Sequence, residues 1–546
     1  SFNELDVGYF VPERELDNYT EEERVRYTEG PNEGKLRIYE KGTFIYRLAG
    51  REREKSASYY TPEVLTQCLV KYALKELLEG KTADEILNLT ICEPAMGSAA
   101  FLNEAINQLA EAYLILKQKE TGETISHEDW LQELQRTKMY IADRNVYGID
   151  LNPIAVELGE VSLWLNTIYK GAHVPWFGTQ LVCGNSLIGA RRQVYDTKRV
   201  TTKTANQLWF KVAPKRIPTD EKRDPENEIY HFLLGDPGMA NYTDRVIRSL
   251  EPEAIETLKE WNKQFTKSLE KEELETILRL STIVDDLWER QIQLRKEVAK
   301  QTRDPLTVFG QPENGIYGST SIREKDSIYR HLYKSEEMEN AGPYARLKFA
   351  MDYWCALWFW PIDKAHLLPS RKEFLFDMSL ILEGGVVSVQ AEAQQKLFDD
   401  AVYIEIIETY GDHNEVNLDA LRKNSPRLKL ATEIADRHRF LHWELEFADL
   451  FAERGGFDLI LGNPPWIKVE WKEQDVLSDH QPLFVVKNFT APQTREVRQE
   501  TLKNPGIYQL YLEEYVESAG MLNFLDAVQN YPDLKGVQTN LYKCLD

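Results

Sequence analysis

Cysteine is scarce in this sequence, with five residues in 546 and no pair in a C-x-x-C arrangement. The five are Cys68, Cys92, Cys183, Cys355 and Cys544. The nine histidines form no cluster with them at metal-ligand spacing. We therefore expect no structural zinc and no other metal site, and the pattern favours a reducing cytoplasm.

Long hydrophobic runs are also missing. The run in MDYWCALWFWP, at 351–361, stops well short of the ~20 apolar residues that cross a bilayer. The first residues, SFNELDVGYF, lack the basic start, apolar stretch and cleavage site of a signal peptide. We expect a cytoplasmic protein with no membrane association. Because no initiator methionine stands before Ser1, we also expect the native protein to extend upstream.

Positive charge is in deficit, with a formal net charge of −23. Phosphate binding is driven by locally concentrated Lys and Arg, so any contact with DNA must come from local basic tracts. One tract is REREK at 51–55. The other is ARRQVYDTKRVTTK at 190–203, whose basic residues are Arg191, Arg192, Lys198, Arg199 and Lys203. The alternative for each tract is a solvated loop.

Strand and helix patterns alternate in the first third of the chain. An amphipathic helix at 63–79 has apolar residues at helical spacing: Val64, Leu65, Leu69, Val70, Ala73, Leu74 and Leu77. Strand, turn and helix follow at 86–118 and again at 139–169, and short strands are expected at 178–187 and 455–466. This order predicts an α/β fold with a doubly wound parallel sheet of the Rossmann-like type.

Residues 186–462 are too many for a loop, so we predict a large, mainly helical insertion. Apolar residues at 254–287 recur every three or four positions and favour an αα-hairpin or short coiled coil. The aromatic residues at 353–360 favour a buried segment over a base-stacking surface. At this length two or three domains are expected. We divide the chain into 1–55, 56–190, 191–436 and 437–546, with the sheet formed by the second and fourth parts.

The strongest chemical signal is FDLILGNPPW, in which a buried strand at 459–461 is followed by Asn463, Pro464, Pro465 and Trp466. An exocyclic amine conjugated to a base ring is a poor nucleophile, and it needs oxygen acceptors that draw its hydrogens out of the ring plane. Asn463 offers a side-chain oxygen and Pro464 a carbonyl whose direction is restricted by the two prolines. Trp466 offers a face for stacking an extruded base. The alternative, a sharp turn after a strand, does not require the asparagine or the tryptophan.

A second signal is CEPAMGSAAF at 92–101, where a glycine at a strand-to-helix turn permits close approach of a cofactor. Asp150, in VYGIDLNP, is suited to accept from the hydroxyls of a ribose, and its alternative is a helix N-cap. Asn185, in LVCGNSL, is suited to a purine edge, with a plain turn as the alternative. In SYYTP, Thr61 and Pro62 are expected to cap the first helix, and the tyrosines to cover a cofactor.

In their order along the chain, YYTP, EPAMGSAAF, GID, CGNSL and GNPPW resemble motifs X, I, II, III and IV of the gamma-class N6-adenine DNA methyltransferases. The resemblance covers about residues 56–190 and 437–546. The long insertion, HWELEFADLF at 442–451 and NLYK near the end are similar to the large type IIG-like group. Within it, the methyltransferases of DISARM phage-defence systems are more alike than those of BREX systems.

The resemblance implies S-adenosylmethionine as cofactor and double-stranded DNA as partner, along with other subunits of a defence system. It assigns the target base to Asn463, Pro464, Pro465 and Trp466. It assigns the cofactor to Tyr60, Thr61, Pro62, Glu93, Pro94, Ala95, Gly97, Ser98, Phe101, Asp150, Leu151, Asn185 and Ser186. Among these, Tyr60 and Thr61 would touch the methionine end, Asp150 the ribose and Asn185 the adenine.

The chain departs from the family pattern in three places. Ala99 stands where a glycine is usual, and Asn185 where an aspartate is common, which predicts weaker cofactor binding without a partner or DNA. The chain stops at NLYKCLD, similar to motif V, so we expect the native polypeptide to continue past Asp546. The first 55 residues contain no nuclease triad. The alternative functions are N-methylation of a protein glutamine or an RNA base, and a non-catalytic DNA-sensing subunit.

Overall fold

A four-stranded parallel sheet organises the first half of the molecule. The computed structural model describes residues 8–44, 61–172, 174–219, 221–312, 320–383, 417–465, 469–487 and 489–534. The strands are β1 (Ile91–Glu93), β2 (Val146–Asp150), β3 (Leu181–Cys183) and β7 (Leu459–Ile460), in the order β3-β2-β1-β7. The expected α/β fold with a parallel Rossmann-like sheet is confirmed.

The strand order reverses at β1. From β1 the chain steps to β2 and β3 on one side, and it returns to the other side of β1 only with β7. Ile91 pairs with Leu459, and Cys92 with Ile460. Open α/β sheets bind ligands in the crevice where the strand order reverses, at the carboxyl ends of the strands. The loops after β1 and β7 therefore occupy the position at which a ligand is expected.

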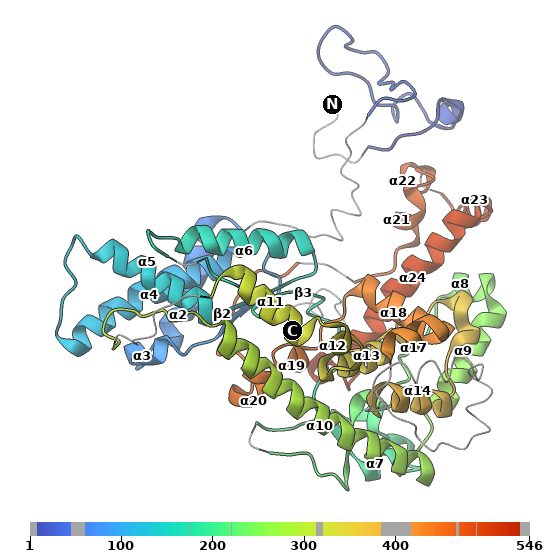
Figure 1. The fold of residues 1–546 in the computed structure, drawn as a ribbon. Helices are drawn as coiled ribbons and strands as arrows, with labels where there is room; N and C mark the ends of the chain where they lie inside the picture. The colour runs from blue at the N-terminus through green and yellow to red at the C-terminus, as the bar shows by residue number, and fades with distance from the viewer. Residues whose placement is uncertain are drawn as a thin grey trace.

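Five helices form the first lobe with the sheet (Figure 1). They are α2 (Glu63–Leu77), α3 (Ala83–Ile86), α4 (Ala100–Thr121), α5 (Trp130–Arg144) and α6 (Pro153–Thr167). The strand, turn and helix units expected at 86–118 and 139–169 are confirmed. The long helix α4 is buried along one side, and its apolar residues form the centre of a hydrophobic core with α2, α5 and the strands.

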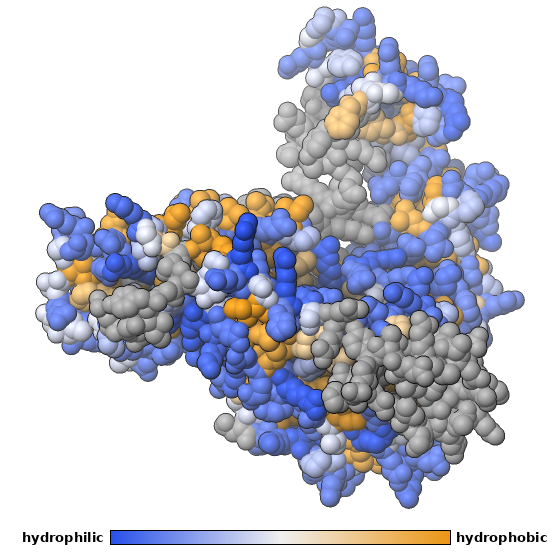
Figure 2. All heavy atoms as spheres, viewed as in Figure 1, coloured by the Kyte–Doolittle hydropathy of each residue, from blue (hydrophilic) through white to orange (hydrophobic). Residues whose placement is uncertain are grey.

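Apolar residues on the outer side of this lobe were assigned wrongly. Only Thr66, Val70 and Leu74 of α2 are buried, whereas Val64, Leu65 and Leu69, which were expected on its core face, are exposed. Ile460, in the edge strand β7 of the described sheet, is 61% exposed, so the expected buried strand at 459–461 is only partly buried. Hydrophobic side chains also gather on the upper face of this lobe, over α6 (Figure 2).

The insertion is mainly helical, as predicted, and adds a small antiparallel sheet that was not predicted. Its strands are β4 (Gln193–Asp196), β5 (Lys215–Arg216) and β6 (Glu228–Tyr230), in the order β5-β4-β6. The larger described helices are α8 (Arg245–Leu250), α9 (Pro252–Phe265), α10 (Lys271–Thr302), α11 (Ile322–Tyr333), α12 (Glu336–Ala341), α13 (Pro343–Ala356), α14 (Arg371–Glu383), α17 (Leu418–Asn424) and α18 (Pro426–His438).

The expected hairpin of paired helices at 254–287 is wrong. Helix α9 packs mainly against a short 3-10 segment at Ile362–Leu367, and α10 packs against α13, α14 and α20 (Ala448–Arg454). The periodicity correctly indicated two amphipathic helices, but each of them buries its apolar face against a partner distant in sequence. Tertiary packing, rather than the connection between the two helices, decides which helices pair.

The aromatic segment at 353–360 is buried, as predicted. Tyr353, Trp354, Trp358, Phe359 and Trp360 are all at most 2% exposed. The indole nitrogen of Trp354 donates to the carbonyl of Leu234 over 2.8 Å, so its polar atom is satisfied inside the core. These rings stabilise the second lobe and are not available to stack on a base.

The C-terminal elements pack on the insertion. They are α19 (Trp443–Glu446), α20, α21 (Glu473–Ser478), α22 (Leu483–Val486), α23 (Ala491–Thr501) and α24 (Pro505–Asp526). One hydrophobic core runs from Ile188 to Ala527 and includes α13, α14, α18 and α24. Residues on both sides of the boundary predicted at 436 and 437 belong to this core. Within the described residues, no helix is both long and apolar enough to cross a membrane.

Candidate active site

The turn after β1 is open to solvent above Gly97. Gly97 has φ +52°, a left-handed conformation, and a Cβ added there would meet no atom within 4 Å. The N–H of Met96 donates to the carbonyl of Ile149 over 2.9 Å, which ties the turn to the neighbouring strand β2. Ala99 ends the turn with φ +62° and is fully buried. The turn therefore leaves room for a ligand at the carboxyl edge of the sheet.

Glu93 lies beneath this turn and is 2% exposed. One oxygen of its carboxylate accepts from the N–H of Leu102 over 3.3 Å, in the first turn of α4. Burial raises the pKa of Glu93 well above its ordinary value, and the nearby Asp150 raises it further. Phe101 is buried in the core below the turn, whereas Pro94, Ala95 and Ser98 are half-buried at its surface.

Asp150 joins the ends of β1 and β2. Its Oδ2 accepts from the N–H of Gly97 over 2.8 Å, and its Oδ1 accepts from the N–H of Asn152 over 2.8 Å. The N-cap of α6 is Asn152, which accepts from Ile154, so the alternative that Asp150 caps this helix is wrong. Leu151, beside it, is 48% exposed. The half-buried Asp150 carboxylate thus faces the space in front of Gly97.

Asn185 begins a turn after β3 that is held by residues from far along the chain. Its Oδ1 accepts from the N–H of Leu187 over 3.1 Å, so the side chain forms the plain turn considered as an alternative. Its backbone N–H donates to the carbonyl of Arg439 over 2.7 Å. The indole of Trp443 donates to the carbonyl of Ser186 over 2.9 Å. The hydroxyl of Tyr531 donates to the carbonyl of Leu187.

Arg439 also contacts the neighbouring strand end. It ends α18 with φ +51°, and its guanidinium donates to the carbonyl of Leu151 and contacts the sulfur of Cys183. Sequence reasoning missed Arg439, Trp443 and Tyr531. Only HWELEFADLF carried a signal, as a family-like helix, because these contacts join segments more than 250 positions apart.

Asn463 lies beside the turn that follows β1. The N–H of Leu461 donates to the carbonyl of Cys92 over 2.9 Å, so β7 stays paired with β1 to its end. A Cβ added to Gly462 would lie 3.7 Å from Cγ of Glu93 and 3.7 Å from Cδ of Pro94. The exposed Asn463 therefore follows at the same carboxyl edge as Gly97. Its amide nitrogen donates to the hydroxyl of Thr61 over 3.2 Å.

Thr61 does not cap the first helix, contrary to expectation. The residue before α2 is Pro62, and no side chain caps the helix. The hydroxyl of Thr61 instead accepts from Asn463. Pro464 and Pro465 are half-buried, and Tyr60 and Trp466 lie outside the described residues, as does the tract at 51–55.

The site fits a cationic, ribose-containing cofactor. Gly97 offers open space, Asp150 offers a carboxylate beside it, and Glu93 is a buried acid whose ionisation a nearby positive charge would favour. S-Adenosylmethionine carries positive charge on its sulfonium and ammonium groups, together with a ribose. Within the described residues, no group of three or more His, Cys, Asp or Glu side chains is placed to hold a metal ion.

Two segments of the chain match family models. Residues 36–185 match the N-6 DNA Methylase model, and residues 330–519 match the Eco57I restriction-modification methylase model. The first match includes β1, β2, β3 and the turn at Gly97, and the second includes Asn463. The two segments are therefore similar to N6-type DNA methylases, and the parallel sheet is consistent with the fold of such enzymes.

The chain is also similar to a protein of Methanocaldococcus jannaschii named "Putative type II restriction enzyme and methyltransferase". The two are 27% identical over 202 residues, which cover 28% of this chain and 16% of that protein. The chain thus matches about a sixth of its relative's length. No solved structure matches the chain.

Proposed function

We propose that this protein transfers a methyl group from S-adenosylmethionine to the N6 amine of an adenine flipped out of duplex DNA. The observation that carries the proposal is the position of Asn463 and Gly97 at the carboxyl edge of two paired strands. The Gly462 backbone lies against Glu93 and Pro94 there. A target amine at Asn463 and a cofactor at Gly97 would therefore share one space.

The loop after β7 supplies the acceptors for the amine. The amide nitrogen of Asn463 donates to the hydroxyl of Thr61, and in this proposal the amide oxygen accepts from the target amine. The carbonyl of Pro464 is the second acceptor, with its direction restricted by the two prolines. Acceptors held in place before the reaction stabilise the positive charge that develops on the amine as its nitrogen bonds to the methyl group and the methyl–sulfur bond breaks; the amine then loses its proton. Trp466 remains proposed as the stacking face for the base.

The loops after β1, β2 and β3 hold the cofactor in this proposal. The turn at Gly97 approaches it closely, and Asp150 accepts from the ribose hydroxyls. Asn185 and Ser186 face the adenine, while Tyr60, Thr61 and Pro62 cover the methionine end. The cofactor supplies an electrophilic methyl group. The surrounding residues orient this group toward Asn463 and exclude water from it.

The biological setting proposed is modification of self DNA in a restriction-modification-like defence system of the DISARM type, in the cytoplasm and with other subunits. The match to a restriction-modification methylase model and the described relative support the restriction-modification part. The DISARM assignment rests on the sequence resemblance alone. Double-stranded DNA is the proposed substrate.

The test is transfer of tritium from methyl-labelled cofactor to duplex DNA, RNA and protein offered in parallel. The proposal expects label in duplex DNA only, and its loss with Asn463→Ala. The matched control is Asn88→Ala. Asn88 is exposed and lies just before β1, at the opposite end of the sheet, so this variant should retain the parent rate of methyl transfer. Label in RNA or protein would favour the other methyltransferase alternatives. Cofactor binding without transfer to any acceptor would favour a non-catalytic subunit.

A further inference from the structure

A cavity of about 360 Å³ lies between the small sheet, α10 and the two helices α19 and α20. It is lined by Arg192, Arg216, Thr219, Trp288, Glu444 and Phe451, among others. Its volume is in the range of small-molecule sites, ~300 to 1,000 Å³. Most of these residues belong to the insertion or to its junction with the sheet, and none has a role in the proposed methyl transfer.

Two guanidinium groups line this cavity against aromatic rings. The guanidinium carbon of Arg192 lies 5.8 Å from the ring centre of Trp288, and that of Arg216 lies 5.8 Å from the ring centre of Phe451. Arg216 also donates to the carbonyl of Gly455. These contacts hold both cations at the wall. Such placement suits an anion, because the planar guanidinium group binds phosphate and carboxylate with paired hydrogen bonds.

The cavity contains polar atoms that lack partners. Oε2 of Glu444 and Nε of Arg192 are buried and have no hydrogen bond with any other described atom. Glu444 as a whole is 8% exposed, and burial raises its pKa above the ordinary value. Buried polar atoms without partners are costly and therefore uncommon. A ligand that offers both a hydrogen-bond donor and an anion would satisfy them together.

The buried arginines in the described part of the chain have carboxylate partners. Arg223 pairs with Asp285, Arg295 with Asp449, and Arg427 with Asp377. Among the described residues no ion pair joins Arg192 or Arg216 to a carboxylate, although Arg216 attracts the Glu444 carboxylate at longer range. Part of their positive charge acts on Glu444, Tyr230 and the two aromatic rings, and the remainder is available to a ligand in the cavity.

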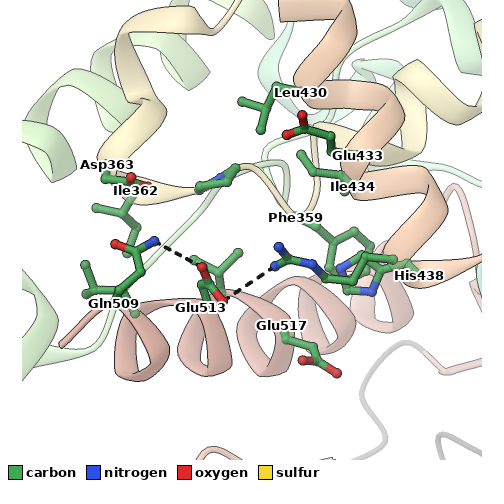
Figure 3. A pocket seen from close by; sticks show the side chains of 14 residues that line it. Phe359, Ile362, Asp363, Leu430, Glu433, Ile434, His438, Gln509, Glu513 and Glu517 are labelled. Carbon is green, nitrogen blue, oxygen red and sulfur yellow. Dashed lines mark hydrogen bonds and ion pairs between the residues drawn. The ribbon is translucent and has the colours of Figure 1, made fainter. Parts of the chain in front are cut away.

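Another hollow among the described residues differs from this cavity in its volume and in the pairing of its charged groups. It has about 50 Å³, lies between α18 and α24, and is surrounded by several carboxylates (Figure 3). Glu513 there interacts with Arg437 at 3.9 Å and accepts from Gln509 at 3.1 Å. Its small volume and its paired charges carry no comparable inference.

The arginine-lined cavity is separate from the methyl-transfer site. Gly455, which borders it, comes before β7, whereas Asn463 comes after β7. The two positions lie at opposite ends of the same strand. A base held at Asn463 would therefore not reach the cavity.

One backbone segment links the two sites. It runs from Asn185 at the cofactor turn to Arg192 in the cavity wall. Along it, the carbonyl of Ile188 accepts from the N–H of Leu441 over 2.9 Å, and the N–H of Ala190 donates to Nδ1 of His442 over 3.0 Å. Packing leaves no room to shift at Gly189, where an added Cβ would collide with the carbonyl of Leu441. Movement of Arg192 would be transmitted to the turn at Asn185.

We propose that this cavity binds a small phosphate-bearing ligand of mononucleotide size, whose phosphate contacts Arg192 and Arg216 and whose hydrogen-bond donor contacts Glu444. Binding stabilises the segment between Arg192 and Asn185 and so tightens the cofactor turn. The ligand site itself is independent of the methyl-transfer function, because the cavity and its unpartnered atoms stand whatever reaction occurs at Asn463; the effect on the cofactor turn rests on the proposed function.

Thermal unfolding of the whole chain with inorganic phosphate, AMP, GMP or a short DNA duplex tests this site. Ligands that bind only the folded state raise the melting temperature in a saturable way. We expect AMP or GMP to do so and phosphate alone to bind at least ~10-fold more weakly, because a lost donor pairing is worth about one power of ten. Arg216→Ala and Glu444→Gln should each weaken nucleotide binding by at least that factor.

Arg216 is exposed on a strand edge, and the glutamine variant keeps the shape of Glu444, so both variants should fold. Arg290→Gln is the matched control. It removes a solvent-facing arginine from α10, the helix that carries Trp288, and should leave binding unchanged. No saturable shift with any small probe, equal binding of phosphate and nucleotides, or a variant-sensitive shift with the duplex alone would each overturn the proposal.

Discussion

The side-chain amide of Asn463 donates to the hydroxyl of Thr61 over 3.2 Å, between residues 402 positions apart. Thr61 stands just before the first helix, and Asn463 just after the strand that completes the described sheet. This contact brings together the two loops assigned to the cofactor and to the target base. It also gives Thr61 a role in place of the helix cap expected from its sequence.

Removing the Thr61 hydroxyl should slow methyl transfer without abolishing cofactor binding. Thr61→Val keeps the shape of the side chain and removes the acceptor that orients the Asn463 amide. We expect kcat to fall by about 3-fold to 10-fold, the effect of one neutral hydrogen bond. Steady-state rates on duplex DNA measure it. Thr61→Ser keeps the hydroxyl, so its kcat should stay near that of the parent. Equal losses of kcat in the valine and serine variants would contradict this role.

A methyl group at Gly97 should block the cofactor site. Gly97 adopts φ +52° with open space in front of it, so Gly97→Ala introduces strain and places a methyl group where the cofactor is proposed to lie. We expect a loss of stability of roughly 1 to 2 kcal/mol from the left-handed backbone. Cofactor binding, measured by calorimetry, should weaken by at least ~10-fold, since close approach of the cofactor to the backbone needs glycine at this position. Gly80→Ala is the matched control, because Gly80 lies before β1 and also has a left-handed backbone, with φ +76°. This variant should show a similar loss of stability and an unchanged affinity for the cofactor.

Asp150 should matter for both the turn and the cofactor. Its carboxylate accepts from Gly97 and Asn152, and the proposal adds the ribose hydroxyls. Asp150→Asn keeps the size but loses the charge, and hydrogen bonds to charged groups contribute ~1.5 to 3 kcal/mol. We expect the dissociation constant of the cofactor to rise by about 10-fold or more. Binding to S-adenosylhomocysteine measures it without turnover, and unaltered affinity would remove Asp150 from the site.

Tyr531 should affect cofactor affinity from a distance. Its hydroxyl donates to the carbonyl of Leu187 in the turn that begins at Asn185, and the guanidinium of Arg191 lies 4.8 Å from its ring centre. Tyr531→Phe keeps the ring and removes one hydrogen bond. The KM for cofactor should rise by about 3-fold to 10-fold while kcat stays nearly constant.

The matched control for Tyr531 is Tyr508→Phe. Tyr508 lies on α24, and its hydroxyl donates to Glu251, away from the cofactor turn. This variant should leave the KM unchanged. A fall in kcat with no change in KM for Tyr531→Phe would show that the turn at Asn185 does not serve the cofactor.

Asp236 should make folding stability depend on pH. It is 4% exposed, and burial raises its pKa to about 7 from an ordinary value of 3.8. The folded state binds the Asp236 proton more tightly than the unfolded state does. The stabilisation of the folded state by this proton is therefore complete below pH ~4 and is lost as the pH rises toward 7. The loss is at most roughly 4 kcal/mol.

The folding stability of Asp236→Asn should be close to that of the parent at pH 4 and higher than that of the parent at pH 8. Urea unfolding midpoints at both pH values, with the exposed Asp363→Asn as control, measure the difference. A difference between parent and variant that does not change with pH would contradict the assignment.

The elements that position the site could be predicted because their signals are local. A buried strand followed by a glycine turn and an apolar-periodic helix predicted β1, Gly97 and α4, and a second such unit predicted β2 and Asp150. Parallel strands end at one edge, so the placement of Gly97 and Asn463 at the same edge of the sheet followed from the fold class. The left-handed conformation of Ala99 agrees with the glycine usual at that position in the methyltransferases that the sequence resembles.

The remaining features depend on packing between distant segments. Nothing near Tyr531 or Arg439 in sequence indicates contact with the turn after β3. The partners of α9 and α10 are set by which helix faces meet in the shared core, and periodicity alone gives only the faces. The small sheet at 193–230 has strands of two to four residues, too short for an alternation pattern to show.

The central claim is that Asn463 activates the N6 amine of adenine beside a cofactor held at Gly97. The most direct measurement is mass spectrometry of nucleosides from duplex DNA incubated with the protein and cofactor carrying a deuterated methyl group. The account predicts labelled N6-methyldeoxyadenosine with the parent, reduced by at least ~100-fold with Asn463→Ala. Labelled methylcytosine in place of methyladenine, or a product undiminished by that substitution, would contradict it.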